Sequence, residues 1–255
     1  MHSTRPDLRL FVLHHAGGSH LPYRTWPAAL PGTWDVRLLD APGHGLLLDL
    51  PQITDAGRLA DFLLDTIEPE LTGPYALFGH SMGALVSYEI TRRIVERGLP
   101  PPVWIGLSAR AAPQSAGRTS AYHQLPAAEL RTRLKRFGGT PDGVLDDPEL
   151  WALFDPVIRA DLRLVETWRP APGTAPLPVA LSAFAGGADH AAPPLGWPAG
   201  PSTPSTSWAC GSSTAVTSIS GRSRAAAAAD RTGRGHGARR GGRDALLLNL
   251  RCRPA

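Results

Sequence analysis

The 255-residue sequence predicts an α/β fold, in which a mostly parallel central sheet is covered by helices on both faces. Two observations favour this fold. Short apolar runs typical of buried strands alternate with segments that repeat apolar residues at helical spacing. The alternation is interrupted once, by a long helical stretch that we interpret as an insertion between two strands.

Five apolar runs predict the strands of the sheet. Each is four to six residues long and is rich in Leu, Val, Phe or Ala, which is typical of strands buried on both faces. The predicted strands are Leu8–Leu13, Trp34–Leu39, Tyr75–Phe78, Val103–Ser108 and Val179–Phe184.

Two amphipathic segments predict helices that connect these strands. In Ala56–Ile67, the apolar residues Leu59, Leu63 and Ile67 share one face. Ala84–Glu96 repeats apolar residues in the same way. We expect each connection to be a right-handed crossover between parallel strands.

Residues 114–170 predict the insertion, with helices at Leu130–Phe137, Asp147–Phe154 and Pro156–Trp168. The segment GGTPDG separates the first two, and Pro156 separates the last two, since proline usually ends a helix. We expect these helices to form a lid, because ligands bind at the carboxyl ends of strands in open parallel sheets. The alternative is that they only cover one sheet edge.

Composition divides the chain into a domain at residues 1–194 and a basic tail at residues 195–255. The tail holds nine arginines and two acids, whereas the preceding residues are mildly acidic. No apolar run approaches twenty residues and the N-terminus does not read as a secretory signal, so we expect a cytoplasmic monomer without membrane contact. Cys210 and Cys252 provide neither a disulfide framework nor metal-site spacing.

The pentapeptide Gly79-His80-Ser81-Met82-Gly83 follows a predicted strand and precedes a predicted helix. Glycines on both sides of a serine permit a sharp strand-to-helix turn that exposes the hydroxyl at the end of the sheet. This context predicts that Ser81 is a catalytic nucleophile. The alternative is a Gly-rich turn with a capping serine.

A second element, His15-Ala16-Gly17-Gly18, follows the first strand. Hydrolases with a G-x-S-x-G turn place part of the oxyanion hole in such a loop, so we expect the backbone N–H groups of Ala16 and Met82 to face the oxyanion. The alternative is an ordinary strand-end loop. We expect no metal at the neighbouring histidines, because no carboxylate or cysteine cluster accompanies them.

Asp189 follows the last predicted strand and is the candidate acid of a Ser-Asp-His triad. Asp155 and Asp161, both in the insertion, are interpreted as surface charges.

Several longer motifs make the sequence similar to type II thioesterases, the stand-alone α/β-hydrolases of polyketide and nonribosomal peptide gene clusters. The motifs are HHAGGS, PGHG, GPYALFGHSMGALVSYEI, LSARAAP and LRTRLKRFGGTPDGVLDDPELWALFDPVIRADLRLVETW. The segment LLLDL at residues 46–50 departs from the family, which usually has an arginine and polar residues there.

The resemblance implies an α/β-hydrolase fold, a nucleophile at Ser81, an orienting acid at Asp189 and an oxyanion hole at Ala16 and Met82. It also implies hydrolysis of acyl groups from the phosphopantetheine arm of acyl or peptidyl carrier proteins, without a cofactor. The alternatives are a carrier-binding protein without activity and a general carboxylesterase.

The family's triad histidine, in a Gly-Gly-His motif beyond the aspartate, is not identified in this sequence. Only His190 and His236 follow Asp189, one adjacent to it and the other in a low-complexity stretch. The Arg- and Gly-rich composition of the tail allows three interpretations. The tail is a polyelectrolyte arm for nucleic acid, a disordered tail without a partner, or the product of translation in the wrong frame. It lacks the interleaved aromatic residues of nucleic-acid stacking proteins, so we expect no nucleic-acid partner.

Translation in the wrong frame explains more features of the tail than the other two interpretations do. Arginine greatly outnumbers lysine, which occurs only at Lys135, and this bias is typical of GC-rich DNA. One set of codons that encodes Thr214–Ser220 also encodes Gly-Gly-His-Phe-His-Leu when it is translated in a frame shifted by two bases. The histidine codon then spans Val216 and Thr217, 27 residues beyond Asp189. We therefore expect the frame to break near Pro194 or Leu195, and the chain as written to be a weak or inactive hydrolase.

Overall fold

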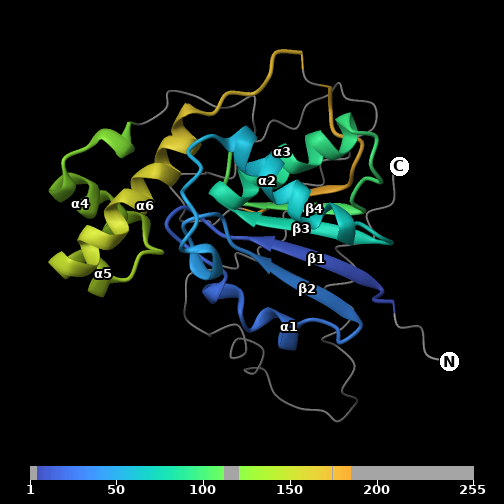
Figure 1. Ribbon diagram of the computed structural model, residues 1–255, viewed down its shortest axis with the longest axis horizontal. Coiled ribbons are helices and arrows are strands. Elements are labelled where there is room, and N and C mark those ends of the chain that lie inside the picture. Colours follow the sequence, from blue (N-terminus) through green and yellow to red (C-terminus); the bar gives the residue numbers. More distant parts are fainter. Residues whose placement is uncertain (1–4, 112–120, 174, 185–255) are drawn as a thin grey trace, which may run out of the picture.

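The computed structural model describes residues 5–111, 121–173 and 175–184, and the fold below concerns these residues. Five parallel strands form one sheet in the order β2-β1-β3-β4-β5, so their carboxyl ends lie at one edge (Figure 1). The strands are β1 (Leu8–Leu13), β2 (Trp34–Leu39), β3 (Tyr75–His80), β4 (Trp104–Ser108) and β5 (Leu181–Phe184). The predicted α/β fold with a parallel sheet is confirmed.

The helices of the described chain fall into two groups. Those that cover the sheet are α1 (Trp26–Ala29), α2 (Ala56–Ile67) and α3 (Met82–Glu96). Those of the insertion are α4 (Ala127–Phe137), α5 (Asp142–Asp146) and α6 (Pro148–Thr167). Short 3₁₀ helices lie at η1 (Leu21–Tyr23), η2 (Gly45–Leu47), η3 (Glu68–Glu70) and η5 (Tyr122–Gln124).

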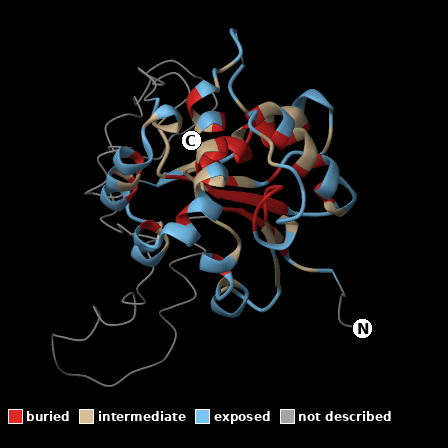
Figure 2. Ribbon diagram, turned by 60° about the vertical axis from the view of Figure 1, so that its left-hand side comes forward, coloured by how far each residue is buried: buried red, intermediate tan, exposed pale blue. Residues whose placement is uncertain are grey.

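The two faces of the sheet have separate apolar cores. Alternate side chains such as Phe11 and Leu77 pack against α2 and α3. Their neighbours Val12 and Phe78 face the opposite side, where Tyr23 and α1 cover them. Burial on both faces explains why these strands are almost continuously apolar, and Figure 2 shows the buried sheet enclosed by partly exposed helices.

The insertion extends beyond the carboxyl edge of the sheet, where α4, α5 and α6 form a separate helical layer (Figure 1). Its own small core contains Leu130, Trp151 and Ile158. A carboxylate from α6, Glu166, accepts hydrogen bonds from the backbone N–H groups of Tyr122 at 2.8 Å and His123 at 3.2 Å. This contact fastens η5 to α6.

The predicted helix break at Pro156 is wrong, because α6 runs through that proline as one helix of 20 residues. Pro156 removes one backbone donor. Buried side chains on both sides of it, Trp151 and Ile158, nevertheless join the same core, so packing outweighs the missing bond. The Asp147 carboxylate caps the helix by accepting from the N–H groups of Glu149 and Leu150. The predicted separator GGTPDG instead contributes to α5.

Two predictions concern residues outside the described part of the chain, namely the candidate acid Asp189 and the basic tail at residues 195–255. Residues 112–120, at the start of the insertion, also lie outside it. Within the described helices, none is both long and apolar enough to cross a membrane.

Candidate active site

Ser81 connects β3 to α3 in a conformation that L-residues rarely adopt. Its φ is 54° and its ψ is −106°, whereas the residues on either side belong to regular structure. Such a conformation costs about 1–3 kcal/mol and is concentrated at functional sites. The turn therefore has the geometry of a nucleophile elbow at the carboxyl edge of the sheet.

The glycines on either side of the elbow are required by close backbone contacts. A Cβ atom on Gly79 would lie 2.0 Å from the carbonyl oxygen of Gly83. A Cβ atom on Gly83 would lie 2.3 Å from the carbonyl oxygen of Leu13. The spacing of the motif thus has a packing reason: both glycines let strand, turn and helix approach more closely than any side chain allows.

The adjacent strand stabilises the elbow. The N–H of Ser81 donates to the carbonyl oxygen of Ser108 at 2.8 Å, and the Oγ of Ser108 lies 3.0 Å from Nδ1 of His80. Both contacts come from the last residue of β4. They hold Ser81 and the preceding His80 in place and therefore fix the orientation of the serine.

The loop His15–Gly18, called the HAGG loop below, lies beside the start of α3. A Cβ atom on Gly83 would come within 2.7 Å of the carbonyl oxygen of His14, the residue before the loop. Ala16 packs against the main core. The structure therefore brings the HAGG loop and the Ser81 turn together at one edge of the sheet. That the N–H groups of Ala16 and Met82 form an oxyanion hole there stays a prediction.

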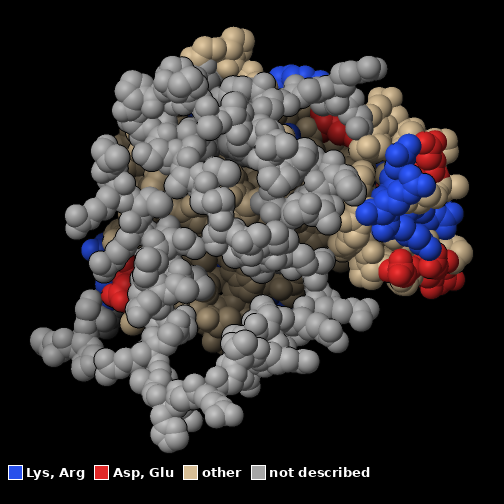
Figure 3. All heavy atoms as spheres, turned by 180° about the vertical axis from the view of Figure 1, so that it is seen from behind, with Lys and Arg blue, Asp and Glu red and all other residues tan. Residues whose placement is uncertain are grey.

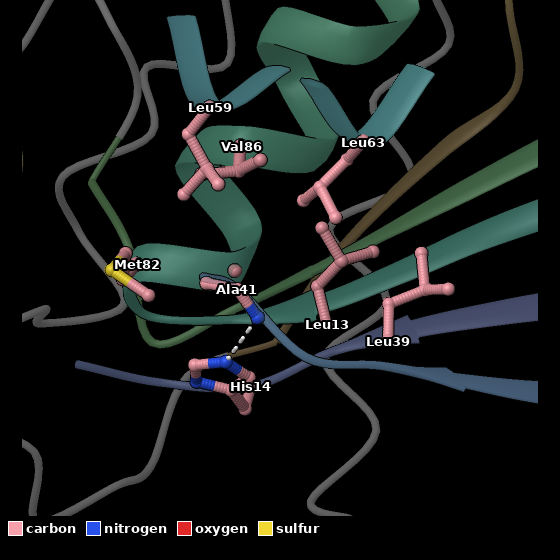
Figure 4. Close-up of a pocket in the computed structure, with 9 residues that line it drawn as sticks. Leu13, His14, Leu39, Ala41, Leu59, Leu63, Met82 and Val86 are labelled. Atoms are coloured by element: carbon pink, nitrogen blue, oxygen red, sulfur yellow. Dashed lines mark hydrogen bonds between the residues drawn. The ribbon is translucent and has the colours of Figure 1, made fainter. Parts of the chain in front are cut away.

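Beneath the elbow is a cavity of about 10 Å³ (Figure 4). His14 is the polar side chain of its lining, and both ring nitrogens are already bonded, Nδ1–H to the His15 carbonyl at 2.8 Å and Nε2 to the Ala41 N–H at 3.1 Å. The void is far smaller than a ligand pocket, so it is not a candidate substrate site. Its lining is Leu13, His14, Leu39, Ala41, Leu59, Leu63, Met82, Gly83 and Val86.

The interpretation of Asp161 as a surface charge is wrong. The residue is 2% exposed, and its Oδ2 accepts from the Gly17 N–H at 2.6 Å and from Nε2 of His44 at 2.8 Å. Asp161 lies three residues after Ile158, on the face of α6 that turns toward the HAGG loop. Asp155, in contrast, is partly exposed and pairs with Arg159 of its own helix at 2.8 Å.

The charge states of the nearby histidines differ. Burial, together with the neighbouring His44, lowers the pKa of His14 to about 4. Burial and His80 lower the pKa of His15 to about 4. Burial also acts to lower the pKa of His44, but the hydrogen bond and charge of Asp161 outweigh it, so this pKa lies above its usual range. At neutral pH, His14 and His15 are therefore uncharged.

Each described histidine has a partner other than Ser81. The partners of His14, His44 and His80 are given above, and the backbone of Gly139 bonds to His15. The remaining two bind carboxylates: His20 pairs with Asp40 at 2.6 Å, and His123 with Glu166 at 2.5 Å. The candidate acid Asp189, His190 and His236 lie outside the described residues.

The helical layer has charges of both signs at its surface, visible side by side in Figure 3. Lys135 of α4 pairs with Asp146 of α5 at 2.5 Å, and Arg133 lies 3.8 Å from Glu129. Opposite charges interspersed in this way partly neutralise one another. Over the described residues, no group of three or more His, Cys, Asp or Glu side chains could hold a metal ion.

A parallel sheet with a strained serine between β3 and α3 defines the α/β-hydrolase class. The family model "Thioesterase domain" matches residues 8–240. The chain therefore belongs to the thioesterase family, and the recognition of a type II thioesterase is confirmed.

Individual relatives agree with this family. The chain is 31% identical over 188 residues to gramicidin S biosynthesis protein GrsT of Aneurinibacillus migulanus, covering 74% of this chain and 73% of GrsT. It is 32% identical over 187 residues to thioesterase PikA5 of Streptomyces venezuelae, covering 73% of this chain and 66% of PikA5.

The fold is also similar to solved structures. For RedJ, a thioesterase from the prodiginine biosynthetic pathway in Streptomyces coelicolor, the TM-score is 0.69 at 35% identity, covering 74% of this chain and 70% of RedJ. For BorB, a type II thioesterase from the borrelidin biosynthetic cluster, the TM-score is 0.64 at 34% identity, with coverages of 72% and 74%.

Sequence reasoning missed the Asp161–His44 pair. A signal was present, because the acid lies on the apolar face of an amphipathic helix, three residues from Ile158 and three from Leu164. A charge on such a face requires a buried partner. Nothing in the sequence identified His44 as that partner, since 117 residues separate the two.

Proposed function

We propose that this thioesterase hydrolyses acyl groups from the phosphopantetheine arm of acyl or peptidyl carrier proteins, an editing reaction in polyketide and nonribosomal peptide biosynthesis. The observation that carries this proposal is the conformation of Ser81, which directs a serine to the sheet edge beside the HAGG loop. The pathway assignment is supported by relatives named for the biosynthesis of gramicidin S, prodiginine and borrelidin.

The proposed reaction has two steps. The Ser81 oxygen attacks the thioester carbonyl, forming a bond to carbon, while the backbone N–H groups of Ala16 and Met82 donate to the oxyanion. The carbon–sulfur bond then breaks, and the arm leaves as a thiol that takes up the serine's proton. Water attacks the acyl-serine ester and releases the carboxylic acid. Asp189 is the proposed acid that orients the base.

The base is the missing part of this scheme. The described histidines are engaged elsewhere, and Asp189 is followed only by His190 and His236. We infer that the chain as written lacks a competent base because its frame breaks near Pro194. In a comparable triad, loss of the base lowers turnover roughly a millionfold.

A second candidate function follows from the same lack of a base. A chain that keeps the fold and the helical layer, but not the triad, could bind carrier proteins without hydrolysing their thioesters. A general carboxylesterase is a third candidate, because Ser81 chemistry alone does not distinguish oxygen esters from thioesters.

The decisive experiment applies three reagents to the chain corrected in frame near codon 194, because the chain as written is inferred to lack a base, and to a matched Ser81→Ala variant of it. A fluorophosphonate probe reports whether Ser81 is reactive, through a mass increase on the peptide that contains it. Acyl-loaded carrier protein and p-nitrophenyl esters report thioesterase and esterase activity. Labelling with carrier deacylation supports the proposal, labelling with ester hydrolysis alone favours the carboxylesterase, and carrier binding without labelling favours the non-catalytic protein.

A further inference from the structure

Asp161 of the insertion joins two loops that belong to the sheet domain. One oxygen, Oδ2, accepts from the backbone N–H of Gly17 in the HAGG loop and from the imidazole of His44 in the loop after β2. Asp161 and His44 side chains are each 3% exposed. A single buried atom of α6 therefore contacts both the HAGG loop and the loop after β2.

The geometry around His44 favours a charged imidazole. Its Nδ1 lies 3.1 Å from the carbonyl oxygen of Pro42, and its Nε2 lies 2.8 Å from the Asp161 carboxylate. Both neighbours are acceptors, so both ring nitrogens must carry a proton for both bonds to form. A neutral His44 satisfies only one of them.

The other groups around His44 do not replace that charge. The His14 ring lies 4.8 Å away, between centroids, but burial keeps it neutral at pH values above about 4. His15 is neutral for the same reason, and Asp40 already binds His20. His44 is thus the cation that balances the buried Asp161 carboxylate, whose isolation in the core would be costly.

We propose that Asp161 and His44 form a proton-dependent latch that fastens helix α6 onto the HAGG loop. With His44 protonated, the carboxylate holds both loops against α6. When His44 loses its proton, one of its two bonds is lost and the carboxylate loses its countercharge, so the HAGG loop and α6 loosen together. Both residues are positioning residues, because they act through the loop.

Hydrogen–deuterium exchange on the full chain tests the latch without requiring turnover, so its result is independent of the proposed activity. Exchange is measured from pH 6 to pH 9, corrected for intrinsic rates, over the HAGG loop, over α6, and over α2 as an internal reference. In the wild type, exchange in the HAGG loop and α6 is expected to rise at least tenfold with pH, while α2 stays constant.

The variants are Asp161→Asn and His44→Gln, and each should abolish the pH dependence. Asp155→Asn makes the same chemical change on a partly exposed residue of the same helix, so it should behave as the wild type. If Asp161→Asn fails to fold, His44→Gln decides, because it leaves the Gly17 bond in place. A pH dependence that persists in His44→Gln, or that affects α2 equally, would overturn the latch.

Discussion

Ile158 of the insertion occupies the space that a side chain at Gly17 would need. Its Cγ1 lies 2.8 Å from the position of a Cβ atom on Gly17, and Gly17 has a φ of 69°. We expect Gly17→Ala to destabilise the protein by about 1–3 kcal/mol, because alanine is strained at this φ and also displaces Ile158. Urea unfolding monitored by circular dichroism measures this difference.

Gly143→Ala is the matched control for this prediction. Gly143 lies in α5, has no neighbour within 4 Å of its Cβ position and does not have a positive φ. Alanine there should be neutral or stabilising by up to about 1 kcal/mol. Comparing the double variant Gly17→Ala/Ile158→Ala with Ile158→Ala alone separates the two causes, since both lose the Ile158 side chain and only the strain at Gly17 distinguishes them. A neutral Gly17→Ala would show that α6 does not pack on the HAGG loop in solution.

Two replacements of Ser81 should separate the backbone strain at this residue from its role in hydrolysis. Ser81→Ala and Ser81→Gly both remove the hydroxyl, so each should abolish hydrolysis without unfolding the domain. Ser81→Gly should be the more stable of the two by about 1 kcal/mol, because glycine adopts the φ of 54° without steric cost. Denaturation midpoints are measured in the chain as written, and carrier deacylation is measured in the frame-corrected chain, where turnover is expected. Full turnover in Ser81→Ala would refute the nucleophile assignment, and equal stability would refute the strain.

Acid should destabilise the protein through His14. Its folded pKa is about 4, below the ordinary histidine value of 6.5, so between these values the unfolded chain binds more protons. The free energy of unfolding therefore falls as pH decreases from 6.5 to 4, by about 1.4 kcal/mol per pH unit for this histidine. His15 adds to the slope, whereas His44, whose pKa is raised, is protonated in both states over this range and changes stability only above pH 6.5.

His14→Gln isolates this contribution. The variant should be less stable than the wild type at pH 7, because it loses the bonds to His15 and Ala41, but the deficit should shrink as pH falls toward 4. Unfolding free energies at half-unit pH intervals give the difference between the two proteins. A deficit that is constant from pH 7 to pH 4 would show that His14 does not titrate with a lowered pKa.

β1, β3 and β4 could be predicted from the sequence because they are buried on both faces, which makes their apolar runs continuous; β2 is only partly buried, and β5 ends in exposed residues. β1 and β2 match their predicted limits, and β3 extends two residues further, to His80. Pro156 shows the limit of a local rule. Proline lowers helix stability at one position, but the shared core of Trp151 and Ile158 depends on residues distant in sequence.

The candidate site was predictable only where its chemistry is local. The glycines around Ser81 are required by contacts within a few residues, so the motif itself carries the information. The Asp161–His44 pair is different, because it forms only when the insertion folds back over the sheet edge. The sequence contains one signal of this pair, the charge of Asp161 on an apolar helix face, and that signal does not identify His44 as the partner.

The last prediction concerns the reading frame near codon 194. Correcting it by two bases should restore a histidine read across the present codons for Val216 and Thr217, and with it the base that we propose Ser81 to lack. The corrected chain should deacylate carrier proteins, whereas the chain as written should show little or no turnover. Both forms are expressed and compared in the same assay, with Ser81→Ala in the corrected chain as the control.

Stability should rise with activity. Among the described residues β5 pairs with β4 alone, and Phe184 at its end is 42% exposed. An in-frame continuation would supply further structure to cover this edge, because an unpaired, partly apolar strand is unfavourable in water. The corrected chain should therefore have the higher melting temperature. Equal activity in the two forms would contradict the prediction and would make His236 the leading candidate base, which His236→Ala in the chain as written then tests directly.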